Sequence, residues 1–404
     1  MDTTKNETKI KEKVKGNRIL DTVIDIFSKY SMVFILIILM IMFQLLTDGI
    51  IFRPLNVTNL ILQNAYVLVL ALGMLLVVLL GNVDLSVGSV VAFVGAIAGV
   101  LMVNNDVNPL ITVLISLAVG AIIGAWNGYF IAYLSIPSFV VTLGGLLMFR
   151  GLTQIILGGQ SLAPFPESFQ FLSSGYLPDF ITGTNMHVTS LIIGAILSVA
   201  AVISMFRIRK KRSENLYETE SFGFFILKAI VLFVTVMAFT WLLASYRGYP
   251  ILLIVLGILT VVYSFITRKT TIGRRIYATG GNRKAAELSG INTNKLEFWV
   301  FVNMGIMSAL AGLILASRLN AATPQAGEGF ELDALAAVYI GGASTSGGIG
   351  TVLGTIVGAL IMGVLNNGMS IMGIGVDWQS AIKGLILIFA VVFDVWNRKR
   401  KLQA

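Results

Sequence analysis

Long apolar runs, separated by short polar or glycine-rich breaks, recur from residue 30 to residue 396. Most runs hold about 20 residues, which lets an α-helix cross the roughly 30 Å hydrocarbon core of a bilayer. The pattern predicts twelve membrane spans, near residues 30–48, 65–82, 86–104, 109–134, 137–157, 187–207, 222–244, 248–267, 295–318, 332–346, 350–372 and 378–396. Glycine or polar residues interrupt the second and tenth of these spans. The fifth could also be a partly re-entrant segment. Ten or eleven crossings are therefore alternative counts.

The composition agrees with this reading. The 404-residue chain is 56% hydrophobic and only 12% charged, with a mean hydropathy of +0.87. A soluble domain carries roughly 25% charged residues, so this chain lacks the polar groups for a fully water-facing surface. Its 41 glycines suit close helix packing in lipid. The predicted fold class is all-α: a polytopic membrane helical bundle with broken helices.

Basic residues fix the direction of the spans. They gather before the first span, at 207–212, at 268–295 and at 398–401, and twelve crossings put all four groups on one side. Positive loops stay cytoplasmic, so both termini are predicted to face the cytoplasm. The net charge of +9 then reflects topology and anionic lipid, and no nucleic-acid partner is expected. The predicted divisions are a cytoplasmic tail at 1–29, a transmembrane domain at 30–396 with an external loop at 158–186 and a cytoplasmic loop at 268–294, and a basic tail at 397–404.

Several kinds of chemistry are excluded by what the chain lacks. It has no cysteine, so disulfides, thiol catalysis and cysteine metal sites are ruled out. His187 is the single histidine and is expected to be a solvated loop residue, so no metal site is predicted. No clustered acid/base pair suggests catalysis. No G-x-x-x-x-G-K-[ST] phosphate loop occurs, so any ATP used must be bound by another subunit.

Two segments outside the spans carry alternatives. In "NRILDTVIDIFSKYS" the apolar residues recur at helical spacing, which predicts an interfacial helix on the inner leaflet; a solvated tail is the alternative. The external loop at 158–186 has no Lys or Arg and is rich in Phe and Pro. A loop of that length is usually functional or disordered, so we expect either a packed cap or docking surface, or a simple connector.

Polar residues interrupt the apolar pattern in "GNVDLSVGS" (81–89). A charged side chain at membrane depth is costly and normally faces a partner, water or a pathway. We therefore predict a discontinuous helix that restarts near Asp84, with Ser86 and Ser89 beside it. A carboxylate there can accept hydrogen bonds from exposed N–H groups at the positive helix end. Direct contact with a sugar or ion is the alternative role.

Two glycine-rich stretches resemble each other: "GAIIGAWNG" (120–128) and "GALIMGVLNNG" (358–368). In the twelve-span topology they run in opposite directions, as an inverted repeat requires. Their glycines also suit ordinary small-residue helix packing. Asn127, Asn366 and Asn367 are candidates for interhelical hydrogen bonds or for a polar pathway. The segment "GGASTSGGIGTVLG" (341–354) predicts a helix break at membrane depth.

The polar island "YATGGNRKAAELSGIN" (277–292) predicts a short, capped helix. Asn282 suits the N-cap and Gly290 the C-terminal cap. So short a helix is marginal alone, and its small residues favour a protein groove over lipid, which needs several bulky apolar residues. A cytoplasmic partner is the preferred interpretation, and a self-contained loop is the alternative. The candidate docking residues are Gly280, Gly281, Asn282, Ala285, Ala286, Leu288, Ser289 and Gly290.

Taken together, these motifs resemble the permease subunits of bacterial ABC importers for monosaccharides. The resemblance runs through most of the chain and is carried by "VDLSVGS" (83–89), "GAWNGYFIAYLSIPSFVVTLGGLLMFRGL" (124–152), "GRRIYATGGNRKAAELSGIN" (273–292), "SRLNAATPQAGEGFELDALAAVYIGG" (317–342) and "LNNGMSIMG" (365–373). The extra apolar pair around 222–267 looks like the longer xylose-type and multiple-sugar branch.

The resemblance implies a non-enzymatic pore subunit in the bacterial cytoplasmic membrane. It implies no cofactor of its own, with ATP on a cytoplasmic ATPase that contacts Gly280–Asn292. It also implies a homodimer and an extracytoplasmic sugar-binding protein, and it places the family's signature carboxylate at Asp84. The cargo would be xylose, galactose, glucose, arabinose or several of these. The main rival is a proton- or sodium-driven transporter, for which Asp84, Asp333 and Asp377 are candidate titrating groups; a passive channel is a third reading.

Overall fold

The computed structural model describes residues 31–181, 186–215, 217 and 221–403, with the side chains of 393–394 and 396–403 left out. Its regular elements in these ranges are all helices. They are a helix at Ser31–Leu46, then α2 (Pro54–Leu79), α3 (Val87–Gly99), η1 (Val100–Asn104), α4 (Pro109–Ala132), α5 (Ser138–Leu157), α6 (Glu167–Ser174), α7 (Val188–Glu214), α8 (Phe222–Ala244), α9 (Ile251–Lys269), α10 (Thr271–Gly281), α11 (Arg283–Leu288), α12 (Thr293–Leu319), α13 (Phe330–Ile340), α14 (Val352–Ile371) and α15 (Val376–Gln403). The interfacial helix expected before residue 30 lies outside these ranges.

Within the described residues, nine helices are long and apolar enough to cross a membrane. This confirms the polytopic helical bundle. The expected span at 332–346 is instead the 11-residue helix α13, which rises only about 17 Å and is too short to cross a bilayer alone. It ends at Gly341 and Gly342, the second of which has a φ of +85°. The glycines that weaken this span in the sequence therefore end its helix.

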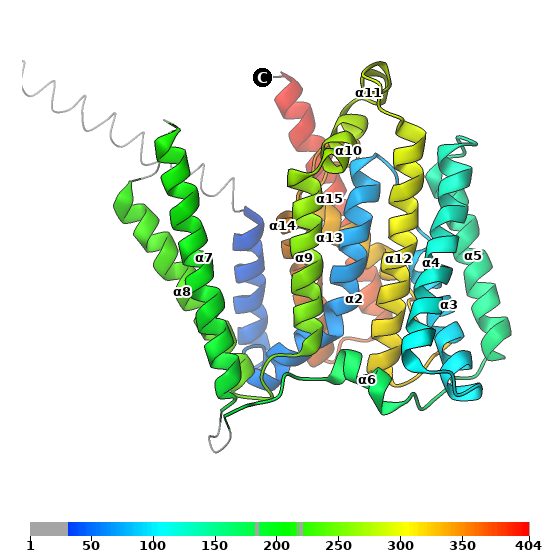
Figure 1. The fold of residues 1–404 in the computed structure, drawn as a ribbon, viewed down its shortest axis with the longest axis horizontal. Coiled ribbons are helices and arrows are strands. Elements are labelled where there is room, and N and C mark those ends of the chain that lie inside the picture. Colours follow the sequence, from blue (N-terminus) through cyan, green and yellow to red (C-terminus); the bar gives the residue numbers. More distant parts are fainter. Residues whose placement is uncertain (1–30, 182–185, 216, 218–220, 404) are drawn as a thin grey trace, which may run out of the picture.

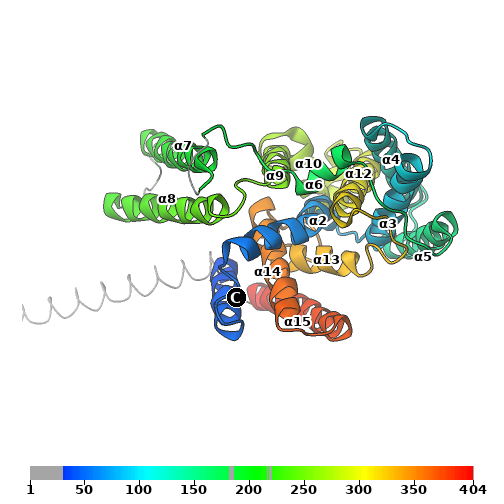
Figure 2. The ribbon, with the colours of Figure 1, turned by 90° about the horizontal axis from the view of Figure 1, so that it is seen from below.

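The centre of the bundle is formed by α2 and α12, which pack against each other (Figure 1). On one flank α12 packs along α4, and on the other α2 packs along α14 (Figure 2). The contact between α4 and α12 is close because glycines face glycines. A side chain at Gly120 or Gly124 would collide with the backbone of α12 at Gly305 or Phe301. Close packing of small residues replaces the hydrophobic effect as the main attraction between helices in lipid.

The two ends of the molecule differ. One end carries α11 and the C-terminus, and the other carries α6 (Figure 1); we call them the α11 end and the α6 end. The helix α6 lies in the segment expected as an external loop and packs on the end of α12. The Ser317 hydroxyl donates to the carbonyl of Phe169 at 2.8 Å and lies 2.8 Å from the Ser173 hydroxyl. The described part of this loop is thus packed on the bundle.

The start of α7 is held by Asp179. Its carboxylate accepts the backbone N–H groups of Val188 and Thr189 at 3.1 Å each and the Thr189 hydroxyl at 2.7 Å. The hydrogen bond from the Thr189 hydroxyl is the main cause that lowers the pKa of Asp179. His187 lies 3.8 Å from the same carboxylate and is half-buried against Gly248. His187 is therefore a loop residue, as expected, but only partly solvated: its side chain is one-third exposed, and Gly248 packs against its ring.

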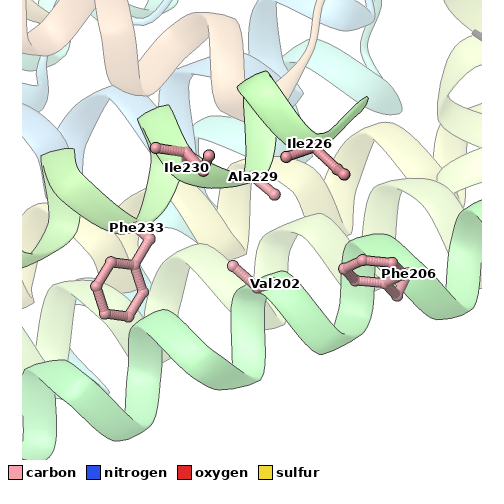
Figure 3. Close-up of a pocket in the computed structure, with 6 residues that line it drawn as sticks. All are labelled: Val202, Phe206, Ile226, Ala229, Ile230 and Phe233. Atoms are coloured by element: carbon pink, nitrogen blue, oxygen red, sulfur yellow. The ribbon is translucent and has the colours of Figure 1, made fainter. Parts of the chain in front are cut away.

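The helices α7 and α8 form a hairpin at the edge of the bundle (Figures 1 and 2). They cross tightly at Gly194, where any side chain would collide with Thr240. Farther along, they diverge and leave an apolar groove of about 260 Å³. Figure 3 shows this groove, with Val202 and Phe206 of α7 facing Ile226, Ala229, Ile230 and Phe233 of α8. The outer faces of both helices are exposed and apolar, as expected for contact with lipid.

Candidate functional site: the α11 helix and the breaks beneath it

The short helix α11 protrudes at the α11 end of the molecule (Figure 1). The Asn282 side chain caps its start by accepting the Ala285 N–H at 3.0 Å, and Gly290 takes the left-handed conformation that ends it, with a φ of +81°. Leu288 is 91% exposed. A single exposed apolar side chain is common on protein surfaces, so Leu288 by itself does not mark a docking surface.

The structure divides the small-residue face predicted for this helix. Ala285 and Ser289 are exposed, whereas Ala286 is 4% exposed and packs inward. The chain turns back after Gly290, where the Ile291 N–H donates to the Ala286 carbonyl at 3.1 Å, and both α10 and α12 contact α11. Ala286 is therefore a packing residue of this chain. The exposed small and apolar side chains of α11 and its end are Ala285, Leu288 and Ser289, and the charged Arg283, Lys284 and Glu287 are exposed beside them.

Arg283 anchors α11 to the start of α12. Its guanidinium donates to the carboxylate of Glu297 at 3.0 Å, to the Asn294 side chain at 2.8 Å and to Glu287 at 3.3 Å. Glu287 also accepts the Thr293 hydroxyl at 2.7 Å. That hydrogen bond, followed by Arg283, lowers the pKa of Glu287. A guanidinium with three hydrogen-bond partners is fixed in orientation as well as in distance. Arg283 therefore joins α11 and the start of α12 into one unit.

Glu297 connects this unit to the 80–86 break between α2 and α3. It is 4% exposed, and each of its carboxylate oxygens has a partner. One accepts from Arg283, and the other accepts the Asn82 amide at 2.6 Å. A buried carboxylate needs both charge and hydrogen-bond compensation, and Glu297 receives them from two segments that are far apart in the sequence. We call Arg283, Glu297 and Asn82 the relay.

Asp84 lies two residues beyond the relay and is 3% exposed. It accepts the Ser86 N–H at 2.9 Å and the Ser86 hydroxyl at 2.6 Å, directly before α3 begins. The Asn127 amide of α4 donates to the same hydroxyl at 3.1 Å, and the Ser89 hydroxyl donates to the Ser86 carbonyl at 2.7 Å. Asp84, Ser86, Ser89 and Asn127 thus form one buried cluster. Asp84 thus fixes Ser86, the N-cap residue of α3, and places a carboxylate near the positive end of that helix.

A second junction joins three backbone segments beside the relay. The Gly348 N–H donates to the Leu79 carbonyl at 2.9 Å, and any side chain at Gly280 would collide with that carbonyl. Gly347 and Gly348 both have positive φ values, +81° and +73°, which side chains disfavour. The end of α2, the end of α10 and the glycine-rich turn before α14 therefore meet at backbone contact.

Asn366 and Asn367 lie in a different cluster, at the contact of α14 with α2 and α13. Asn367 and Asn56 exchange amide hydrogen bonds at 3.0 and 3.1 Å. Asn366 donates to Asp333 at 3.4 Å, and Lys383 of α15 lies 3.0 Å from the same carboxylate. The predicted pathway residues therefore separate into two groups, one around Asp84 and one around Asp333.

The sequence interpretation missed the relay and the Asp333–Lys383 pair. Each of them left a signal in the sequence, a single charged residue inside an apolar run. Glu297 lies near the start of one run, and Lys383 lies within another. Such charges mark partners at membrane depth, but the partners are 215 and 50 positions away. For a gradient-driven transporter, Asp333 is an unfavourable titrating group because it is 1% exposed and paired with a cation.

The fold and these junctions define a class: a polytopic membrane protein whose broken helices connect to the protruding helix α11. Residues 56–391 match the family described as permease components of the branched-chain amino acid transport system. The chain belongs to this permease family. It is therefore a multi-pass, non-catalytic membrane subunit of an ABC importer, and ATP is bound by a partner ATPase.

Curated relatives match nearly the whole chain. The xylose transport system permease protein of Haemophilus influenzae is 38% identical over 92% of this chain and 97% of its own length. The xylose transport system permease protein of Escherichia coli K12 is 39% identical over 92% of each chain. The ribose import permease protein of the same organism is 33% identical over 85% of this chain and 86% of its own. No solved structure matches the chain.

Proposed function

We propose that this chain carries monosaccharides of the xylose and ribose type across the bacterial cytoplasmic membrane. A substrate-binding protein delivers the sugar at the α6 end, and an ATPase docks at the α11 end. The single observation that carries the energy-coupling role is α11: a rigidly anchored helix whose exposed surface is Ala285, Leu288 and Ser289. Xylose is the first cargo to test, because the relatives at 38% and 39% identity are named for it.

The topology that goes with this function has twelve crossings and two cytoplasmic termini. The nine long helices are supplemented by Ser31–Leu46, by α15, and by α13 together with the 320–329 segment that leads into it. The α11 end is the cytoplasmic end, because α10, α11 and the basic 268–295 segment lie there.

An inverted repeat fits the same arrangement, with α2–α5 as one unit and α12–α15 as the other. The helix pairs correspond: α4 packs on α12 as α14 packs on α2, and α3 packs on α12 as α13 packs on α2. The start of α3 and the segment that leads into α13 meet where Gly88 and Gly327 approach so closely that a side chain on either would collide with the other's carbonyl. Broken helices that meet between two repeats are typical of transporters.

The relay gives ATP-driven movement a route into the membrane. Closure of the ATPase moves α11; Arg283 and Glu297 transmit the movement to Asn82; and the 80–86 break carries it to the start of α3. A second copy of the permease completes the pathway, and sugar affinity resides mainly in the binding protein. Asp84 acts as the cap of α3 in this scheme rather than as a sugar ligand.

The test is docking at the exposed part of α11. We expect Ala285→Trp to reduce both ATPase association and ATP-driven xylose uptake by at least tenfold in proteoliposomes that also contain the ATPase and the binding protein. Ala200→Trp is the matched control, because Ala200 is exposed on the lipid-facing helix α7 and should leave both readouts unchanged. Wild-type association and uptake in the Ala285→Trp variant would exclude α11 as the coupling site.

A further inference from the structure

A polar cleft opens between the second half of α5 and residues 324–331, which connect α12 to α13. Its volume is about 350 Å³. Five polar or charged side chains line it: Arg150, Gln154, Gln325, Glu328 and Glu331. So many polar groups beside a membrane-spanning helix are costly unless they have a ligand or water to bind. Neither the relay nor the Asp84 cluster includes any of them.

The cleft is a built feature with a fixed wall. Arg150 donates two hydrogen bonds, to the carbonyls of Pro324 at 3.0 Å and Ala326 at 2.7 Å. These bonds hold the connecting segment against α5. Gly327 and Gly329 have positive φ values, +69° and +75°, which let the segment turn into the bundle and start α13 there.

The inner end of the cleft lies beside the contact between the two proposed repeat units. The carboxylate of Glu331 lies against the backbone of Gly88, so that a side chain at Gly88 would occupy its place. Gly88 is the second residue of α3, the helix that the relay is proposed to move. A ligand in the cleft would therefore lie directly beside the part of the pathway that changes.

The lining groups match the hydroxyl groups of a neutral sugar. Carboxylates accept hydrogen bonds, amides both donate and accept, and a guanidinium donates, whereas each sugar hydroxyl does both. The cleft's volume lies at the small end of ligand sites, which suits one monosaccharide ring. Its two carboxylates and one guanidinium give it a net negative charge, so a sugar phosphate is disfavoured.

We propose that this cleft, the outer cleft, is a weak binding subsite for a neutral monosaccharide within the permease. The proposal rests on the function proposed above and assigns residues to it. Binding is weak because Gln154, Gln325 and Glu328 are solvent-exposed and because a transported ligand must leave again.

The chain contains no cysteine, so a single introduced thiol reports on the outer cleft alone. In the permease–ATPase complex in lipid nanodiscs, Gln325→Cys is modified with a methanethiosulfonate reagent with and without 100 mM D-xylose. We expect xylose to slow the modification at least threefold, and xylose 5-phosphate to have no effect. Gln160→Cys, exposed outside the cleft, is the control and should react equally in all conditions.

A second variant tests whether xylose protects the thiol by direct binding in the cleft or through a conformational change elsewhere. In the Gln325→Cys background, Gln154→Leu removes one proposed sugar contact from an exposed position and should raise the xylose concentration for half-protection at least threefold. Equal modification rates with and without xylose at Gln325→Cys would overturn the outer cleft even if ATP-driven uptake is normal. Uptake is measured on the same variant reconstituted in proteoliposomes with the ATPase and the binding protein. If xylose protects the thiol in nanodiscs but the proteoliposomes show no ATP-driven uptake, the cleft is supported and the transport role is overturned.

Discussion

At the scale of single residues, each buried carboxylate in the bundle has a specific partner. Asp84 is bound by Ser86, Glu297 by Arg283 and Asn82, and Asp333 by Lys383. Removing one partner of a buried ion pair leaves an uncompensated charge, which costs more than the pair itself contributes. These side chains therefore constrain which helices are neighbours, and the stability of the bundle is sensitive to each of them.

Lys383→Ala tests this at the Asp333 pair. Asp333 is 1% exposed and Lys383 is 20% exposed, so the variant leaves a buried carboxylate without its cation, held only by long hydrogen bonds from Asn366 and Tyr66 at 3.4 and 3.5 Å. We expect a loss of about 3–5 kcal/mol in the free energy of unfolding, measured by urea titration in detergent micelles. The double variant Asp333→Asn, Lys383→Met should recover most of it. A single variant as stable as the parent would show that Asp333 is not charged in the folded protein.

At the scale of elements, local sequence determines the helix ends and packing determines what they join. Asn282 and Gly290 mark α11 in the sequence, and both act as its caps in the structure. The direction in which α11 faces follows instead from its packing on α10 and α12, in which Ala286 is buried and Leu288 is exposed. The small-residue face read from the sequence was therefore only partly available for docking.

Glu297→Ala tests the relay as the link between α11 and the 80–86 break. The variant removes both of its hydrogen bonds, so we expect uptake to fall at least tenfold while the ATPase still binds and hydrolyses ATP. Asn82→Ala, which breaks only the far bond, should uncouple in the same way. Glu287→Ala is the matched control, since Glu287 also binds Arg283 but does not reach the break. Coupled, wild-type uptake in both Glu297→Ala and Asn82→Ala would rule out the relay.

At the scale of the whole molecule, the two ends carry the two proposed sites. The α11 end carries the basic 268–295 segment and α11, the proposed docking helix, and the α6 end carries α6, packed on α12, and the segment that lines the proposed outer cleft. The bundle between them is held by glycine contacts rather than by large apolar side chains at the crossings of α4, α12 and the half-helices. Such a bundle can shift along backbone contacts with little repacking of side chains.

The absence of cysteine makes the proposed orientation directly measurable. Leu288 of α11 is 91% exposed and Phe171 of α6 is 56% exposed. With a membrane-impermeant thiol reagent, we expect Phe171→Cys to react in intact spheroplasts and Leu288→Cys only in inverted vesicles. The reverse pattern would place α11 outside and remove it from any contact with an ATPase.

The sequence by itself determined the class of the protein, most of its spans and the caps of α11, because these depend on the local density of apolar residues and on neighbouring backbone groups. It also marked the breaks at Asp84 and at 341–354. Only the tertiary structure decided which polar and charged side chains meet. Asn82 and Glu297 are 215 positions apart, and Gly88 meets Gly327 only when the start of α3 packs against the segment that leads into α13. No periodic pattern encodes such pairs, since they depend on how α2, α4 and α12 pack together in lipid.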